Sequence, residues 1–172
     1  MGLRPGRTIR RIERPYTRVS KSVPRKSYVV GVPFPKTHQF EMGDKNGNFD
    51  TILYAAAEKA VQIRDQAVDA GRIVCHKFLE LKLGPTGYFM KILAYPHQVL
   101  REKPIATGAG ADRYSQGMAR AFGKPAGTAI QTKENQKLVE LKINKKDIEI
   151  GKLALKKFGL KISTPVKVEI EE

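Results

Sequence analysis

The sequence is poor in the residues that build disulfides and metal centres. It has one cysteine, three histidines and no tryptophan among 172 residues. The single thiol, Cys75, can form neither an internal disulfide nor a cysteine zinc cluster. The histidines His38, His76 and His97 are far apart and lack the H-E-x-x-H spacing of a helix-borne zinc site. We therefore expect no metal or other cofactor, and we expect Cys75 to be a small buried side chain.

Long apolar runs are also missing. No stretch of 18 consecutive apolar residues occurs, so no segment is predicted to span a bilayer. Arginines stand near the N-terminus where a signal peptide would need its apolar centre. We therefore expect a cytoplasmic protein that has no membrane partner.

Acidic residues are scarce. Lys and Arg number 32 against 17 Asp and Glu, which gives a formal net charge of +15. The excess is concentrated: residues 1–26 hold nine basic and one acidic residue, 101–124 five and two, and 137–161 eight and three. These regions contribute +8, +3 and +5, so the remaining segments sum to −1. A basic surface of this kind favours nucleic acid or an anionic membrane surface as partner.

Residues 1–28 are predicted to be an RNA-binding arm. Prolines at 5, 15 and 24 disfavour a helix, and too few apolar residues are present to form a core, so we expect this arm to be extended or disordered on its own. A solvated basic tail is the alternative. Arginine at seven of nine basic positions favours two-point phosphate contacts, with Tyr16 available for stacking. The candidate RNA-binding residues are Arg4, Arg7, Arg10, Arg11, Arg14, Arg18, Lys21, Arg25 and Lys26.

Residues 97–127 are predicted to be a long functional loop. The stretch is rich in glycine and basic residues and has no period that would bury one face. Loops beyond about 12–15 residues are uncommon in compact domains and are usually functional or disordered. Glycine allows close backbone approach, and guanidinium groups hold phosphates in two-point contacts. We expect RNA contacts from Arg101, Lys103, Arg113, Arg120 and Lys124, and backbone approach at Gly108, Gly110, Gly117 and Gly123.

Two phosphate-binding motifs can be considered for this loop, and neither fits. Gly108 and Gly110 could open a dinucleotide fingerprint, but Arg113 stands in place of the third glycine. The Gly117 to Gly123-Lys124 spacing is one residue too long for a phosphate-binding loop, and Pro125 replaces its Ser or Thr.

Two other classes of protein remain as alternatives. A nucleic-acid-modifying enzyme would need an acid, a base or a metal in the loop, where its only candidates are His97, Glu102 and Asp112. Asp112 is adjacent to Arg113, and an ion pair or a turn cap explains it more simply than a general base does. We therefore predict no catalytic residue. A free-standing RNA chaperone would share the basic arm without the ordered domain.

The rest of the chain, residues 29–172, is predicted to be a single α+β domain. Strands are expected at 37–42, 51–57, 88–95 and 165–170, and residues 128–132 and 137–143 are expected to form a hairpin. A first helix is expected to bury Ile63, Ala67, Ala70, Val74, Phe78 and Leu81 and to end at Gly84. Ending it at Gly71, with a strand at 73–83, is the less favoured alternative. A second helix is expected from Asp147 to Phe158, capped by Gly159, with Ile148, Leu153 and Leu155 among its apolar positions. These elements predict a two-layer sandwich with a mainly antiparallel sheet and two helices.

Four groups of residues in chain order resemble one known family. They are Gly31-Val-Pro33 with Pro35-Lys36, the run Tyr95 to Arg101, Gly110 to Arg113 with Gln116 to Met118, and Ala121 to Pro125 with Gly127-Thr128. The sequence resembles, in its archaeal type, the universal large-subunit ribosomal protein sixteen family, called the L-ten-e protein in archaea and eukaryotes. The resemblance covers most of the chain.

The resemblance implies a non-enzymatic constituent of the large ribosomal subunit with the same α+β fold. It implies binding to large-subunit rRNA near the cleft that receives aminoacyl-tRNA, with other ribosomal proteins as neighbours. In that family the glycine-rich loop reaches toward the peptidyl-transferase centre and the tRNA acceptor ends, and the basic arm threads between RNA helices. The loop is therefore expected to help position tRNA during translation.

Overall fold

The computed structural model describes residues 4–13, 29–119 and 121–171, and within them it has two antiparallel sheets and two helices. The larger sheet has the order β1 (Glu41–Gly43), β4 (Phe89–Ile92), β7 (Lys137–Ile143), β2 (Thr51–Ala57) and β8 (Val166–Glu171). The smaller sheet has the order β3 (Gln62–Arg64), β6 (Lys124–Gln131) and β5 (Gln98–Glu102). The helices are α1 (Asp65–Leu83) and α2 (Ile148–Gly159), and short 3-10 turns lie at Gly6–Thr8, Ala111–Arg113 and Lys145–Asp147.

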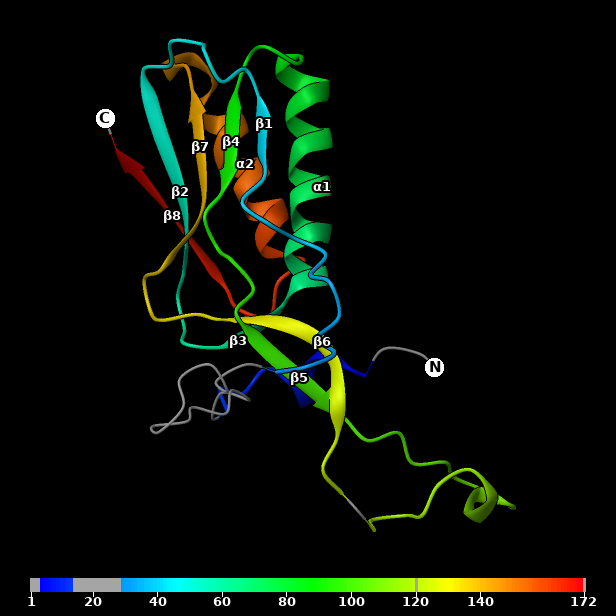
Figure 1. The fold of residues 1–172 in the computed structure, drawn as a ribbon. Coiled ribbons are helices and arrows are strands. Elements are labelled where there is room, and N and C mark those ends of the chain that lie inside the picture. Colours follow the sequence, from blue (N-terminus) through cyan, green and yellow to red (C-terminus); the bar gives the residue numbers. More distant parts are fainter. Residues whose placement is uncertain (1–3, 14–28, 120, 172) are drawn as a thin grey trace, which may run out of the picture.

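Both helices cover one face of the larger sheet, and the smaller sheet lies across one end of it (Figure 1). From this end the segment between β5 and β6 extends away from the body (Figure 1). The predicted α+β class, with antiparallel pairing and two helices, is confirmed.

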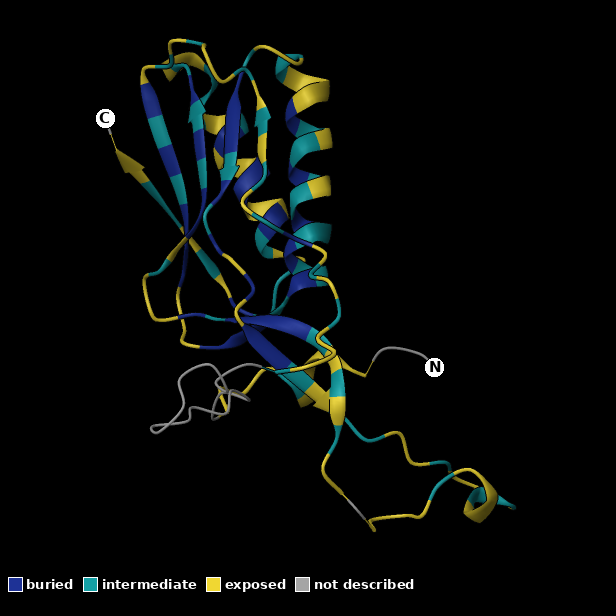
Figure 2. Ribbon diagram, viewed as in Figure 1, coloured by how far each residue is buried: buried dark blue, intermediate teal, exposed yellow. Residues whose placement is uncertain are grey.

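Small residues let the two helices pack closely on each other and on the sheet. A Cβ atom added at Gly71 of α1 would lie 2.6 Å from the ring of Phe158 in α2. One added at Gly151 would lie 2.5 Å from the side chains of Leu53 and Ile143. Glycine at position 71 therefore sets the distance between the two helices, and glycine at position 151 sets the distance between α2 and the sheet. The buried strand and helix positions meet between the layers in one core (Figure 2).

Helix α1 is continuous through Gly71, as expected, but it turns a different face to the core. Its buried apolar positions are Val68, Gly71, Cys75 and Leu79. Leu81, which was expected inside, is 81% exposed, and Phe78 is only partly buried beneath the ammonium of Lys157. The difference arises because Ile63 belongs to β3 and not to the helix, so its burial does not mark the helix face.

In α2 the inward positions also differ from expectation. Leu153 is 52% exposed, whereas Gly151, Ala154, Leu155 and Phe158 are buried. Gly159 lies within the helix, and Leu160 follows as its C-cap.

The expected hairpin between residues 128–132 and 137–143 is wrong. Strand β6 pairs with β3 and β5, whereas β7 pairs with β2 and β4 in the other sheet. The chain leaves the smaller sheet after Thr132, whose backbone N–H donates to the carbonyl of Val61, and it turns at Asn135 with a positive φ of 57°. The link between the two strands therefore joins the sheets instead of closing a hairpin.

The expected loop 97–127 is shorter than predicted. Residues 98–102 and 124–127 lie in β5 and β6, which pair from Gln98↔Ala129 to Glu102↔Lys124. The connection between them is residues 103–123, with one 3-10 turn. The strand expected at 37–42 is likewise reduced to β1. The strands at 51–57 and 137–143 have the predicted bounds.

Candidate nucleic-acid interface

The N-terminal segment 4–13 is attached to the smaller sheet by hydrogen bonds from two glutamines and from Arg64 of β3, whose Nη2 donates to the Arg4 carbonyl. The backbone N–H of Gln62 donates to the Arg10 carbonyl at 2.8 Å, and its side-chain Nε2 donates to the Ile9 carbonyl at 2.9 Å. The Nε2 of Gln131 donates to the Glu13 carbonyl at 2.9 Å. Gln62 is 3% exposed, so its amide is a buried anchor. This segment was expected to be extended or disordered alone, but it docks on the domain and includes a 3-10 turn.

Docking through backbone carbonyls leaves the basic side chains of the segment in solvent. Arg4, Arg7, Arg10 and Arg11 are all exposed. The other predicted RNA-binding residues of the arm, Arg14, Arg18, Lys21, Arg25 and Lys26, lie outside the described residues.

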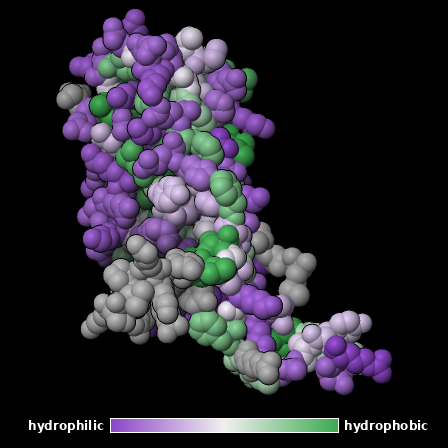
Figure 3. All heavy atoms as spheres, in the orientation of Figure 1, coloured by the Kyte–Doolittle hydropathy of each residue, from purple (hydrophilic) through white to green (hydrophobic). Residues whose placement is uncertain are grey.

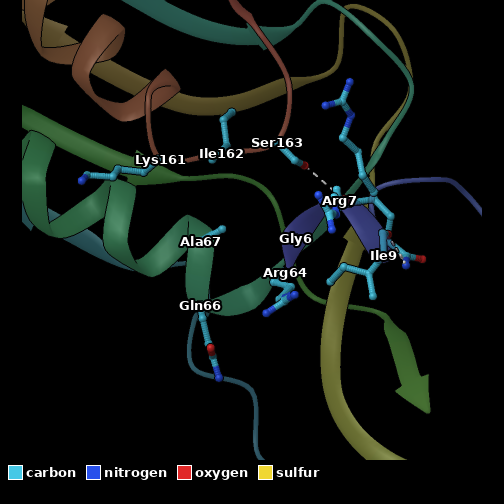
Figure 4. Close-up of a pocket in the computed structure, with 11 residues that line it drawn as sticks. Gly6, Arg7, Ile9, Arg64, Gln66, Ala67, Lys161, Ile162 and Ser163 are labelled. Carbon is cyan, nitrogen blue, oxygen red and sulfur yellow. Dashed lines mark hydrogen bonds between the residues drawn. The ribbon is translucent and has the colours of Figure 1, made fainter. Parts of the chain in front are cut away.

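A hollow of about 540 Å³ lies between this segment, the start of α1 and the link from α2 to β8 (Figure 4). We call it the cationic hollow. Its lining residues are Gly6, Arg7, Ile9, Arg10, Gln62, Arg64, Gln66, Ala67, Lys161, Ile162 and Ser163. Four of them are basic and none is acidic. Arg64 and Lys161 were not predicted as site residues, although Lys161 ends the basic region 137–161.

A second hollow, of about 390 Å³, lies between the same segment and β5. It brings together the predicted residues Arg4, Arg101 and Lys103, and its lining also includes Glu13 and Glu102. Its charge is therefore mixed, unlike that of the cationic hollow.

Two of the predicted RNA-binding residues brace the base of the loop. The guanidinium of Arg101 lies over the Phe122 ring, with Cζ 4.3 Å from its centroid, which is a cation–π contact. The ammonium of Lys103 donates to the Ala119 carbonyl. Both side chains thus link the end of β5 and the first loop residue to Ala119 and Phe122 near the end of the loop, and they have a structural role whatever they bind.

The glycines of the loop serve two purposes. Gly108, Gly110 and Gly117 have positive φ values of 103°, 76° and 54°, a region that L side chains rarely adopt, with nothing within 4 Å of an added Cβ. The backbone of Gly123 packs closely against β5, because a Cβ there would lie 2.8 Å from the Glu102 backbone. Close approach is therefore observed at Gly123, where the neighbour is β5.

The remainder of the loop is exposed and makes internal contacts. The Ala106 backbone N–H donates to Ser115 Oγ at 3.2 Å, and the Ser115 N–H donates to the Ala111 carbonyl at 2.9 Å. Arg113 and Lys124 are exposed, and Arg120 lies outside the described residues. Exposed and half-buried positions dominate this segment (Figure 2).

An aromatic cluster on the surface was not predicted. The Phe34 side chain is 80% exposed and its ring lies 5.2 Å from that of His38, which lies 6.0 Å from the ring of Tyr95. Its sequence signal is an aromatic residue between two prolines, Pro33 and Pro35. Exposed ring faces of this kind can stack on unpaired bases.

The described residues offer no catalytic or metal constellation. No group of three or more His, Cys, Asp or Glu among them could hold a metal ion. Asp112 is exposed at the Ala111–Arg113 turn, and His97 is exposed, with Nδ1 3.1 Å from the Tyr95 carbonyl. The buried carboxylate of Asp65 already accepts hydrogen bonds from Lys36 N–H, Gln66 N–H and Thr128 Oγ1. No helix within the described residues is long and apolar enough to cross a membrane.

Sequence comparison decides the family. A model of the family described as ribosomal protein L16p/L10e matches residues 13–169. The chain belongs to this family. The protein named large ribosomal subunit protein uL16 of Archaeoglobus fulgidus is 40% identical over 172 residues, covering 100% of this chain and 95% of that protein. Those of the same name in Methanocella arvoryzae and Hyperthermus butylicus are 39% and 38% identical, covering 100% and 91% of this chain and 96% and 83% of theirs.

The resemblance deduced from the four residue groups is thus confirmed, including its archaeal type. A member of this ribosomal family is a structural, non-enzymatic component.

Proposed function

We propose that this protein is a constituent of the large ribosomal subunit that holds large-subunit rRNA against its smaller sheet. One observation carries this proposal: cations from segments far apart in sequence gather at one end of the domain. Arg7 and Arg10 meet Arg64 and Lys161 around one hollow, and Arg4 meets Arg101 and Lys103 around the other. Clustering of this kind is the electrostatic footprint of a nucleic-acid partner.

The location of the ion pairs in the domain supports the assignment of the same surface to RNA binding. The described residues form seven salt bridges, and all involve residues of α1, the larger sheet or the turn after β1. None includes Arg7, Arg10, Arg64 or Lys161. Acidic residues thus neutralise part of the charge on the body, where exposed lysines such as Lys145 and Lys152 also lie outside these pairs. The cationic hollow differs because it gathers four basic residues with no acidic residue in its lining, which leaves its charge for an anionic partner. Arginine suits this task because its planar fork matches phosphate.

We further propose that the loop 103–123 reaches toward the aminoacyl-tRNA cleft near the peptidyl-transferase centre and helps to position tRNA. The loop extends from the end that carries the rRNA surface (Figure 1). It has few contacts with the core, and Arg113 at its turn is exposed. Such a segment can be ordered by its partner without disturbing the domain.

The experiment is reconstitution of large subunits with the full-length protein, followed by sedimentation through high salt. The double variant Arg7→Ala, Arg10→Ala should dissociate at lower salt than the wild type, because each lost phosphate contact weakens binding. The matched control is Lys145→Ala, Lys146→Ala, which removes two exposed charges at the opposite end of the domain (Figure 1) and should sediment as the wild type does. Equal dissociation of both variants would contradict the assignment of this surface.

The same measurement separates the alternatives. A free-standing RNA chaperone would leave the subunit as salt is raised, in the wild type as in the variants. An integral component stays bound.

A further inference from the structure

We propose that the cationic hollow receives one unpaired nucleotide of the rRNA, with its base in the hollow and its flanking phosphates at the rim. The proposal rests on the proposed rRNA binding and adds to it a specific site and a specific RNA conformation.

The lining of the cationic hollow combines apolar and basic side chains. Ile9, Ala67 and Ile162 supply apolar surface, whereas the basic residues supply charge without any acidic neighbour in the lining. A volume of about 540 Å³ lies within the roughly 300–1,000 Å³ that is typical of pockets for small ligands. Apolar surface enclosed by cations fits a ligand that has flat apolar faces and negative charge at its edges.

The cations come from different segments of the chain. Arg7 comes from the N-terminal segment and Lys161 from the link between α2 and β8, and in Figure 4 they lie on opposite sides of Ala67. A nucleotide that leaves its stack carries a phosphate on each side of its sugar, so cations on both sides can hold both phosphates. Arg64, whose Nη2 donates to the Arg4 carbonyl, adds a planar guanidinium held at the rim, and a base can stack on its face.

A stacked duplex does not match the lining of the hollow. In a paired helix the base faces are covered by their neighbours, so a protein contacts chiefly phosphates and ribose, and the apolar part of the hollow would stay unused. An unpaired base instead buries its faces against Ile9 and Ile162. Ser163 donates its hydroxyl hydrogen to the Gln62 carbonyl at 3.1 Å, so its oxygen can still accept a hydrogen bond from a base amino group.

The hollow exists only while the N-terminal segment is docked. Gly6, Arg7, Ile9 and Arg10 form one side of it, and Gln62 holds this segment through the Ile9 and Arg10 carbonyls. The buried amide of Gln62 is therefore a positioning residue for the RNA site.

The test compares the chemical reactivity of the rRNA bases in particles reconstituted with full-length variants. Ala67→Trp fills the hollow, and Lys161→Glu reverses a charge at its rim. The control Lys146→Glu makes the same charge change at an exposed position at the far end of the domain. In wild-type particles at least one unpaired base should be protected from dimethyl sulfate, and this protection should be lost in both hollow variants and kept in the control. Protein affinity for the rRNA should fall about ten-fold, in line with the loss of one stacked base.

Two results would overturn the nucleotide site while leaving rRNA binding intact. In one, both hollow variants cosediment and the base reactivities are identical to those of the wild type. In the other, a photo-reactive side chain at Gln66 attaches to a neighbouring protein and not to RNA. If Ala67→Trp disturbs the core, which Ala67 partly contacts, Lys161→Glu decides alone, because Lys161 is exposed. Loss of cosedimentation by the wild type would instead refute the proposed function.

Discussion

Phe158 is the side chain through which the two helices meet. Its ring is fully buried and lies against Gly71 of α1. Replacing Phe158 with alanine should lower the free energy of unfolding by about 3–5 kcal/mol, because the ring leaves a cavity that the close-packed helices cannot fill. Leu160→Ala, two residues further on and at a 77% exposed position, should change it by less than about 0.5 kcal/mol. Chemical denaturation of both variants measures the difference, and equal midpoints would contradict the packing described.

Phe78 differs from Phe158 in its burial. It was expected to be a core residue, but it is partly buried, with the Lys157 ammonium 3.8 Å from its ring centroid. Its truncation should therefore cost less than that of Phe158.

The Cys75 thiol gives the core a pH dependence. Burial raises the pKa of Cys75 from its ordinary value of 9.0 to about 12. The folded chain thus keeps the proton above pH 9, where the unfolded chain has lost it, so the free energy of unfolding falls as pH rises from about 9 to 12. Below about pH 9 the thiol is protonated in both the folded and the unfolded chain, so it causes no loss of unfolding free energy there. We expect Cys75 to resist alkylation at pH 8 in the native protein and to react in denaturant; fast native labelling would show that the thiol is accessible.

At the scale of elements, the loop 103–123 should govern function more than stability. Arg113→Ala removes an exposed charge that makes no core contact, so the melting temperature should change little, while tRNA binding by reconstituted subunits should fall. Lys133→Ala, an exposed charge in the link between the sheets, is the control and should change neither. Unfolding of the Arg113 variant would make the loop structural, and full activity would make it a solvated linker.

Elements whose signal lies in their own residues could be predicted from the sequence. The bounds of β2 and β7 and the end of α1 at Gly84 follow from local pattern and from a residue that tolerates positive φ. Strands β3 and β5 have three and five residues, and their extended state depends on pairing with β6, as in Ile63↔Ile130 and Val99↔Thr128. Pairing between distant residues leaves no local pattern. Because β3 has no local pattern, the sequence assigns the buried Ile63 to the helix, and this assignment shifts the predicted helix face.

The same limit applies to the candidate site. Composition alone identified Arg7, Arg10 and Arg101, because they stand in basic segments. Arg64 is isolated between apolar and acidic neighbours, and only the fold brings it to the cationic hollow. Likewise, nothing local predicts that Gln62 and Gln131 anchor the N-terminal segment.

On the scale of the whole molecule, the basic residues are unevenly distributed along the chain. Hydrophilic residues cover much of the body, with hydrophobic ones scattered among them (Figure 3). The seven described ion pairs lie on this body, and the excess behind the net charge of +15 comes from residues 1–26, 101–124 and 137–161, the last of which forms β7 and α2 of the body itself. Binding to rRNA should therefore depend steeply on salt.

Deleting residues 1–26 should flatten that dependence while leaving the domain folded. Each neutralised phosphate adds about 0.7–0.9 to the slope of log affinity against log salt, so nine basic groups can account for a change of up to about 6–8. The deletion also removes the carbonyl partners of Gln62, which then becomes accessible to water, so circular dichroism must confirm folding. Changing Arg4, Arg7, Arg10 and Arg11 to glutamine keeps those backbone partners and should reduce the slope by about three. If the deletion leaves the slope unchanged, the arm does not contact RNA. If the deletion flattens the slope and the quadruple variant does not, the phosphate contacts belong to residues 14–26 and the cationic hollow has no part in them.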